Sequence, residues 1–315
     1  MKKLLSIFIL FTALILFAGC NTNEEQAEDS NTNDQTDTST PEETNETFLY
    51  ESETGSVEVP TNPERVVVLS GYTGDVLKLG VNVVGVDTWS KSNPTFEEEL
   101  QDVAEVSEDN LESVISLNPD LIIALSTVKN LDQLTDIAPT VTYTWGKLNY
   151  LDQHIEIGKL LNKEEEATTW VEDFRSRATA IGEEIKAEIG EDTTVSVIEA
   201  FGKDLYVYGN NWARGTEILY QTMDLKMPEK VKEDALESGY FTLSQEVLPE
   251  YVGDYLVLSK YQEADTAFEQ TDTFKNIPAV QNGNVIEMQG EGASFTDPIT
   301  LEKQLAFFKE AFLTK

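Results

Sequence analysis

The feature that most constrains this fold is a single long helical pattern in the middle of the chain. Residues 163–189, KEEEATTWVEDFRSRATAIGEEIKAEI, place apolar side chains at spacings of three and four, which is typical of one amphipathic helix. Those side chains are Ala167, Trp170, Val171, Phe174, Ala178 and Ile181. Gly190 then stands where a C-terminal cap belongs. We therefore expect one long helix that divides the chain into two parts.

Strands and helices alternate in the part before this helix. Leu121–Leu125 is almost entirely apolar, as expected of a strand covered on both faces. Asp109 and Glu112 have the spacing of a capping box, and they predict a helix that ends at Asn118-Pro119. The other predicted strands are Val66–Leu69, Val83–Val86 and Val141–Thr144, and the other predicted helices are Thr73–Leu79 and Tyr150–Leu161.

The same alternation restarts after the long helix. The predicted strands are Val195–Ile198, Leu205–Tyr208, Tyr255–Leu258 and Val285–Met288, and the predicted helices are Ala213–Met223, Ser244–Tyr251 and Pro298–Phe312. The fold class is therefore α/β, with two α/β lobes that each have a central, mostly parallel sheet flanked by helices. One long backbone helix, 163–190, joins an N-terminal lobe (48–162) to a C-terminal lobe (191–315), and a ligand cleft lies between the lobes. A lone helical crossing makes a stiff hinge, so we expect the lobes to move little.

The N-terminal residues have the pattern of a targeting signal. Residues 1–19 combine two lysines, a short apolar run and small residues before Cys20, the pattern of a secretory signal. This pattern resembles a bacterial lipoprotein signal, which implies that Cys20 carries the lipid; the alternative is an ordinary cleaved signal from which Cys20 is lost. Because Cys20 is the only cysteine, the mature chain has no internal disulfide. Residues 20–47 are acidic and almost free of apolar side chains, and we expect a disordered tether.

The charge of the chain excludes one class of partner. The net charge is −36, to which the signal contributes +2 and the tether −9, so the remaining body carries −29. Binding of nucleic acid requires a basic face, so nucleic acid is not expected as a partner. Adsorption of the body to an anionic membrane is disfavoured for the same reason.

The chain also lacks the residues that most enzyme and metal sites need. His154 is the only histidine, and we interpret it as a core or surface residue, because zinc and manganese sites usually take several histidine ligands. A P-loop, a G-x-S-x-G elbow and a dinucleotide-binding glycine motif are all absent from the sequence. We therefore favour a binding protein over an enzyme, with no cofactor and no direct bond from the protein to a metal.

Several longer stretches carry a family resemblance. They are PERVVVLSGYTGDVLKLGVNVVGVD (63–87), NLESVISLNPDLIIALS (110–126), IAPTV (137–141), YGNNWARGTEILY (208–220) and LSQEVLPEYVGDYLVLS (243–259). With the lipid signal and the two-lobe plan, the chain resembles the class III substrate-binding proteins of ABC importers, in the iron-siderophore branch, and within it the Gram-positive ferric hydroxamate-binding lipoproteins. The resemblance implies a monomer, lipid-anchored on the outer face of the cell membrane, that captures a ferric siderophore for an ABC permease and its ATPase. We expect the ligand to be a hydroxamate siderophore. The alternatives within the binding class are a catecholate or citrate-type siderophore, haem and a corrinoid. A siderophore-modifying enzyme is the lower-ranked alternative.

The resemblance also implies site residues. Trp212 and Arg214, on the turn NNWARG, are expected to bind the ligand. The alternative is a structural role, in which Trp212 is a hydrophobic plug at the start of a helix and Arg214 forms a surface ion pair with Glu217. We expect both to be replaceable without unfolding, because they lie on a turn. The remaining candidates are Tyr206 (in preference to Tyr208, on the expectation that only one of the two faces the cleft), Trp145, Tyr72 and Phe295, the last at a position where relatives tend to carry tyrosine.

Two acidic residues complete the set. Glu112 and Glu246 are each expected in the first turn of a helix, one per lobe, after Asp109 and Ser244. The resemblance implies that each docks onto an arginine pocket of the permease. The alternative is that both only stabilise helix N-termini.

Overall fold

The structure, a computed structural model, describes residues 46–314. The expected signal, Cys20 and all but the last two residues of the expected tether lie outside the described residues. None of the helices in this described part is long and apolar enough to span a membrane.

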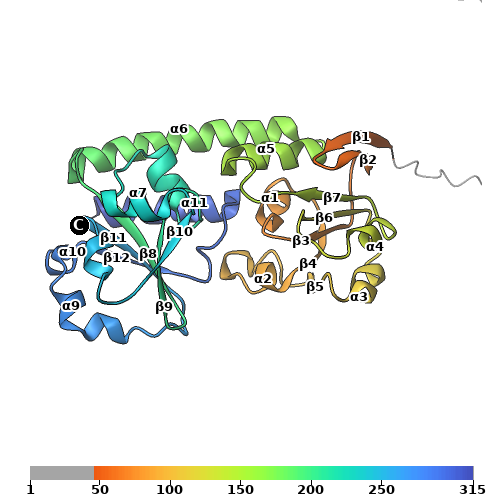
Figure 1. Ribbon diagram of the computed structural model, residues 1–315. Helices are drawn as coiled ribbons and strands as arrows, with labels where there is room; N and C mark the ends of the chain where they lie inside the picture. The colour runs from red at the N-terminus through yellow and green to blue at the C-terminus, as the bar shows by residue number, and fades with distance from the viewer. Residues whose placement is uncertain (1–45, 315) are drawn as a thin grey trace, which may run out of the picture. The chain divides into compact units, whose positions relative to one another are not determined.

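The N-terminal lobe is built on a five-stranded parallel sheet with strand order β5-β4-β3-β6-β7 (Figure 1). Its strands are β3 (Val66–Leu69), β4 (Val83–Val86), β5 (Ala104–Glu105), β6 (Leu121–Leu125) and β7 (Thr140–Tyr143). Its helices are α1 (Thr73–Lys78), α2 (Thr88–Lys91), η1 (Pro94–Phe96), α3 (Leu111–Ser116), α4 (Leu131–Thr135) and α5 (Tyr150–Leu160). Strand β6 is buried along nearly its whole length, as its apolar sequence predicts.

A hairpin that the sequence analysis did not predict precedes this sheet. Strands β1 (Thr47–Ser52) and β2 (Gly55–Pro60) pair antiparallel, so structure begins within the range assigned to the tether. The hairpin belongs to the lobe because Tyr50 is buried in the core, where its hydroxyl donates to Glu156 Oε1 at 2.6 Å.

The C-terminal lobe has a five-stranded mixed sheet with order β10-β9-β8-β11-β12. Its strands are β8 (Val195–Phe201), β9 (Asp204–Tyr208), β10 (Tyr240–Leu243), β11 (Tyr255–Lys260) and β12 (Val285–Gln289). Strands β8, β11 and β12 are parallel, whereas β9 and β10 are antiparallel to their neighbours. The helices are η2 (Glu217–Thr222), α7 (Glu229–Ala235), α8 (Leu248–Tyr251), η3 (Ala267–Gln270), α9 (Asp272–Lys275) and α10 (Pro278–Gln281).

Two predicted helices of this lobe are shorter than expected. The helix expected over Ala213–Met223 is only the π-helical segment η2, because residues 213–215 have positive φ angles that no right-handed helix can include. The helix expected over Ser244–Tyr251 begins at Leu248, and residues 245–247 form a turn instead.

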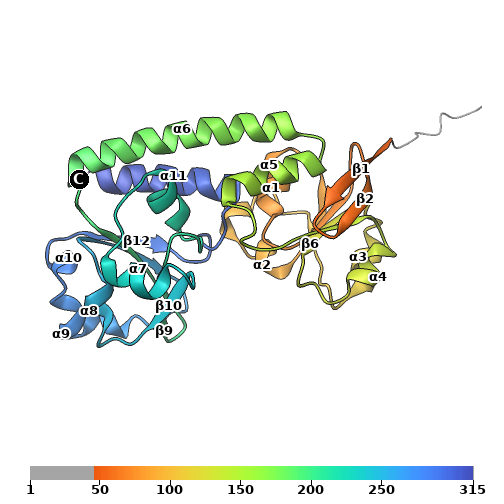
Figure 2. The ribbon, with the colours of Figure 1, turned by 45° about the horizontal axis from the view of Figure 1, so that its top comes forward.

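The predicted long helix is present as α6 (Glu164–Ile189) and ends at Gly190, whose φ is 103°. It packs along both α5 of the N-terminal lobe and α11 (Pro298–Leu313), as both views show (Figures 1 and 2). Arg177 on α6 forms a two-pronged ion pair with Glu302 on α11, with Nη–Oε distances of 2.8 and 2.6 Å.

A second connection between the lobes was not predicted. After β12 the chain returns to the N-terminal lobe, where Phe295 inserts into the core and is only 2% exposed. Helix α11 then starts against α1 and runs back along α6. Lys303 on α11 also donates to the carbonyl of Thr95, at 2.8 Å. The lobes are thus held by α6 and by this returning segment together.

Candidate functional site

The turn that follows β9 has an unusual backbone. Ala213 and Arg214 have φ angles of 57° and 55°, a left-handed conformation that costs free energy for residues other than glycine. Gly215 continues it, and a Cβ there would lie 2.3 Å from the Phe308 ring of α11. Such strain persists only where surrounding contacts over-determine it, and it often marks a functional site.

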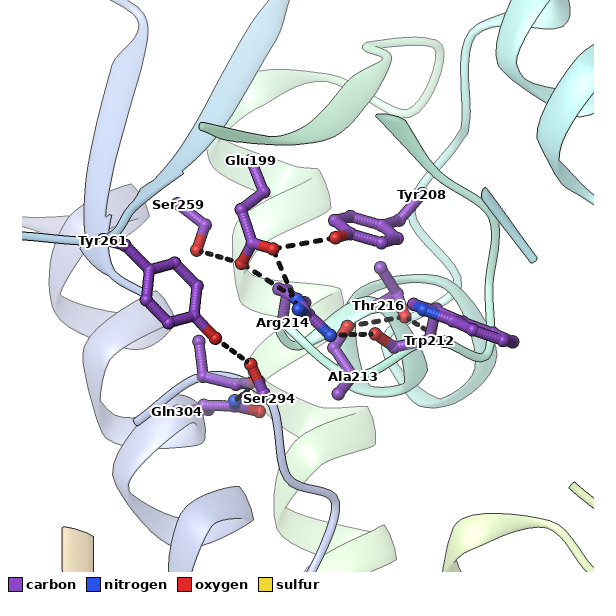
Figure 3. A network of polar contacts seen from close by, with 11 residues as sticks. Glu199, Tyr208, Trp212, Ala213, Arg214, Thr216, Ser259, Tyr261, Ser294 and Gln304 are labelled. Atoms are coloured by element: carbon purple, nitrogen blue, oxygen red, sulfur yellow. Dashed lines mark hydrogen bonds and ion pairs between the residues drawn. The ribbon is translucent and has the colours of Figure 1, made fainter. Parts of the chain in front are cut away.

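Four hydrogen bonds hold this turn, and Figure 3 shows the two that join Trp212, Ala213 and Thr216. The Trp212 nitrogen donates to the Thr216 hydroxyl at 3.1 Å, and that hydroxyl donates to the Ala213 carbonyl at 2.8 Å. The Ala213 nitrogen donates to the buried Glu217 carboxylate at 2.9 Å, and the Arg214 nitrogen donates to the Ala293 carbonyl at 2.7 Å. The turn is therefore locked to η2 and to the segment that returns to the N-terminal lobe.

Arg214 pairs with Glu199 rather than with Glu217, the partner considered from the sequence. Its Nε and Nη2 donate to the two carboxylate oxygens of Glu199, at 2.9 and 2.8 Å. The Tyr208 and Ser259 hydroxyls also donate to Glu199, at 2.8 and 2.9 Å, and the Tyr208 ring lies 4.7 Å from the guanidinium carbon (Figure 3). Burial acts to lower the pKa of Arg214, but the hydrogen bonds and charge of Glu199 outweigh it and raise that pKa.

Arg214 keeps donors for a ligand. Its guanidinium carries five N–H groups. Two go to Glu199 and one goes from Nη1 to the Trp212 carbonyl at 3.2 Å, which leaves one hydrogen on each terminal nitrogen. Because Glu199 balances the positive charge, the pair offers fixed donors without a net charge.

The Arg214–Glu199 pair lies in a cavity of about 310 Å³, here called the arginine compartment. Aromatic rings form most of its wall: Trp89, Phe201, Tyr206, Tyr208, Trp212, Tyr240 and Tyr261. Trp89 comes from α2 of the N-terminal lobe and is 49% exposed, so both lobes contribute.

The expectation that only one of Tyr206 and Tyr208 faces this cleft was wrong. Both line the arginine compartment. Residues two apart on a strand share a face, because side chains alternate with a period of two.

A second cavity of about 330 Å³ adjoins the cleft and is here called the amide compartment. It brings together the predicted residues Tyr72 and Trp145 with Thr296 and the first part of the turn, Asn210 and Asn211. Trp145 is 44% exposed at its edge, whereas Tyr72 is 3% exposed. The predicted site residues thus divide between two compartments of one interlobe cleft.

Phe295 lines neither compartment. Its ring lies at 5.5 Å from that of Phe96 in an edge-to-face contact and is stacked at 6.3 Å on Trp89. Its place in the structure is therefore beneath Trp89, as a support for an aromatic wall residue.

Glu112 and Glu246 are both exposed, one on each lobe. The helix cap of α3 is Asn110 rather than the predicted Asp109, because the Asn110 side chain accepts from the Ser113 nitrogen. Glu246 lies in the turn before α8 rather than in a helix, and a hydrogen bond from Ser244 lowers the pKa of its carboxyl.

His154 is fully buried, one of the two situations expected from the sequence. Its Nδ1 lies 2.9 Å from Asp75 Oδ1, and its ring meets Trp170 edge-on at 5.2 Å. Within residues 46–314, no cluster of three or more His, Cys, Asp or Glu side chains could hold a metal.

Sequence reasoning missed five residues that line the arginine compartment: Trp89, Glu199, Phe201, Tyr240 and Tyr261. A larger concavity of about 940 Å³ lies elsewhere, between β1 and the start of α6. Its rim carries the exposed run Glu164–Glu166, and its one lysine, Lys159, is already paired with Glu156. We therefore place the functional site in the interlobe cleft.

Comparison with known proteins agrees with this geometry. The family model described as periplasmic binding protein matches residues 66–291. The chain is 35% identical, over its whole length and 98% of the relative's, to the iron(3+)-hydroxamate-binding protein FhuD of Bacillus subtilis (strain 168). Among solved structures, the FhuD protein from S. pseudintermedius superposes with a TM-score of 0.78 at 33% identity, covering 86% of this chain and 99% of that one. FhuD2 from Staphylococcus aureus with bound ferrioxamine B gives a TM-score of 0.76 at 33% identity, covering 80% of this chain and 98% of that one. By the family match and by these relatives, the chain belongs to the periplasmic binding protein family.

Proposed function

We propose that this protein captures a ferric hydroxamate siderophore in the interlobe cleft and delivers it to an ABC importer. The observation that carries the proposal is the Arg214–Glu199 pair inside an aromatic wall, with two guanidinium hydrogens left unbonded. The relatives named as iron-hydroxamate-binding proteins and the neighbour with bound ferrioxamine B support the same ligand class.

The chemistry of the ligand fits this pair. Three hydroxamates each carry one negative charge and neutralise Fe³⁺, so the core is uncharged overall while its coordinating oxygens accept hydrogen bonds. The two free N–H groups of Arg214 donate hydrogen bonds to those oxygens. Aromatic faces cover the hydrocarbon part at little entropic cost. The iron is already coordinated by its ligand, so the protein supplies no metal ligand.

A strongly anionic ligand fits less well. A ferric triscatecholate brings several negative charges, and a pocket for it needs unbalanced cations. Among the residues that line the arginine compartment, Arg214 is the only cation, and Glu199 balances it. The low-charge hydroxamate core therefore matches the compartment better than catecholates or citrate-type siderophores do.

Titration of intrinsic tryptophan fluorescence tests the assignment, because Trp89, Trp145 and Trp212 all lie at the cleft. Ferrioxamine- and ferrichrome-type complexes are expected to quench emission at micromolar concentration or below. Absence of quenching, with quenching by ferric enterobactin, haem or a corrinoid instead, would contradict the hydroxamate assignment.

The binding role is distinguished from catalysis by the fate of the ligand. A binding protein returns the siderophore unchanged, whereas an enzyme would cleave its amide or ester bonds. Mass spectrometry of the ligand after long incubation is expected to show the intact molecule only, and cleavage products would revive the enzyme alternative.

Membrane attachment is proposed to run through a lipid on Cys20, at the extracytoplasmic face, since two acyl chains suffice for stable anchoring. Metabolic labelling with a palmitate analogue should label the wild type and not Cys20→Ser. Labelling of both proteins would sink the lipid assignment while leaving siderophore binding intact.

A further inference from the structure

The amide compartment has a composition of its own. Five carboxamide side chains line it: Asn149, Gln153, Asn210, Asn211 and Gln221. Two carboxylates, those of Asp75 and Glu217, also line it, and none of its lining residues is lysine, arginine or histidine. It is therefore polar and acid-bearing where the arginine compartment is aromatic and neutral.

Two buried polar groups of this compartment have no partner. The Tyr72 hydroxyl and the Gln153 amide nitrogen make no hydrogen bond, although the two residues are only 3% and 9% exposed. A buried polar group without a partner costs about 1–3 kcal/mol, so native proteins rarely leave one unless a ligand or water completes it. The Tyr72 hydroxyl can accept as well as donate, and the Gln153 amide can turn to present its oxygen without a change of shape.

The charges around the compartment favour a cation. The Asp75 carboxylate lies 2.9 Å from His154 Nδ1. The charge of Asp75 also helps to raise the pKa of the buried Asp297 carboxyl, so the two acidic groups are close neighbours. Glu217 accepts from the Ala213 nitrogen, and its second oxygen lies 3.1 Å from the Thr216 hydroxyl. The guanidinium of Arg214 is already balanced by Glu199. Among the residues that line the compartment, Asp75 and Glu217 therefore have no lysine or arginine to balance them.

One turn lines both compartments, through Asn210 and Asn211 on one side and Trp212 on the other. Asn210 and Asn211 directly precede Trp212 on the same turn. Across the cleft, the rings of Trp145 and Phe295 each come within 4.0 Å of the position that a Cβ on Gly71 would occupy, and Phe295 stacks on Trp89. Phe295 is itself buried, so the surface open to the methylene chain of a ligand is the exposed ring of Trp145 on one lobe and the turn Asn210–Trp212 on the other.

We propose that the amide compartment binds the free ammonium end of an open-chain hydroxamate siderophore whose ferric core occupies the arginine compartment. The ammonium lies against Asp75 and Glu217 and donates to the Tyr72 oxygen. The inference rests on the proposed siderophore-binding function and adds to it a specificity for linear ligands with a cationic tail.

Two probes that differ in one group test it: ferrioxamine B, with its terminal ammonium, and N-acetyl ferrioxamine B, with a neutral tail and the same ferric core. Fluorescence titration of the full chain should show the ammonium form binding about tenfold more tightly, or better, as expected for a charged hydrogen bond. Quenching by neither probe would overturn the siderophore function as a whole. Equal affinity for both would overturn only the tail site.

Variants then locate the preference. Glu217→Gln removes a charge but keeps an oxygen for the Ala213 nitrogen, and Tyr72→Phe removes a hydroxyl that has no partner, so both should fold. Each should reduce the ratio of the two affinities toward one by weakening the ammonium probe alone. Glu188→Gln, on the exposed face of α6, changes the net charge equally and should leave the ratio at its wild-type value. A full preference retained in both cleft variants, or lost equally in Glu188→Gln, would refute the assignment.

Discussion

The backbone nitrogen of Arg214 donates to the carbonyl of Ala293 at 2.7 Å, which ties the ligand-facing turn to the segment that carries Phe295 into the N-terminal lobe. Gln304 on α11 donates to the same carbonyl, at 3.3 Å. The guanidinium is thus oriented from one side by Glu199 and its backbone is fixed from the other by the interlobe connection. A rigid site of this kind needs little rearrangement to bind, which limits the ordering cost of binding.

Replacement of Arg214 is expected to cost stability as well as binding. Arg214→Ala leaves Glu199, which is 2% exposed, as an unpaired buried carboxylate, and removal of one partner of such a pair typically costs about 3–5 kcal/mol. This revises the expectation that a turn residue can be removed freely. Urea unfolding followed by circular dichroism measures the loss.

The double variant Arg214→Ala with Glu199→Gln separates the two effects. It removes the stranded charge, so it should regain much of the lost stability while siderophore binding stays weak. Recovery of binding in the double variant would show that Arg214 acts only by neutralising Glu199.

Trp89 is expected to contribute contact area from the N-terminal lobe. Because it is 49% exposed, Trp89→Ala should leave the unfolding midpoint nearly unchanged and weaken siderophore binding by about 1–3 kcal/mol. Isothermal titration gives the affinity. The control is Phe241→Ala, an aromatic residue of the C-terminal lobe that is 39% exposed and lines neither compartment. Tight binding by Trp89→Ala would place the ligand outside the arginine compartment.

Asp297 is expected to make stability depend on pH. Burial and the charge of Asp75 raise its pKa from 3.8 to about 7, so the folded state binds a proton more tightly than the unfolded state does. Its contribution is fully present below about pH 4 and is lost as pH rises toward 7, by up to about 4 kcal/mol in total. Asp297→Asn keeps an oxygen for the Ile299 and Thr300 nitrogens and should flatten this part of the profile. The measurement is the urea midpoint at pH 5 and at pH 8, with the exposed Asp109→Asn as control. An equal change of midpoint between the two pH values in wild type and Asp297→Asn would contradict the prediction.

Glu112 and Glu246 are proposed to dock the two lobes onto the permease. The double variant Glu112→Ala with Glu246→Ala should bind siderophore normally in vitro and abolish uptake of radiolabelled iron in cells, because exposed charges of this kind orient a complex without touching the ligand. The control is Glu98→Ala with Glu237→Ala, two exposed acids on the same two lobes. Normal uptake by the first pair would leave both residues as local stabilisers of a helix and a turn.

Local patterns in the sequence were sufficient for the fold class. Patterns among neighbouring residues can be recognised without knowledge of tertiary contacts. They include the periodicity of residues 163–189 and the apolar runs that form β3, β4, β6, β8, β9, β11 and β12. Strands β1, β5 and β10 were missed because their short sequences show no clean alternation. Strand β2 was overlooked although Val57 and Val59 alternate with Ser56 and Glu58. The position of Trp212 and Arg214 on a turn was likewise local information.

Only the tertiary structure decided how the site is assembled. Glu199 and Trp89 come from other elements, and no spacing in the sequence pairs either of them with Arg214. Phe295 lies in the core of the lobe opposite to the one its position in the chain suggests, because the chain crosses twice. The physical reason is that periodicity reports which side chains face a core, whereas ion pairs and cavity walls depend on which elements the folded chain brings together.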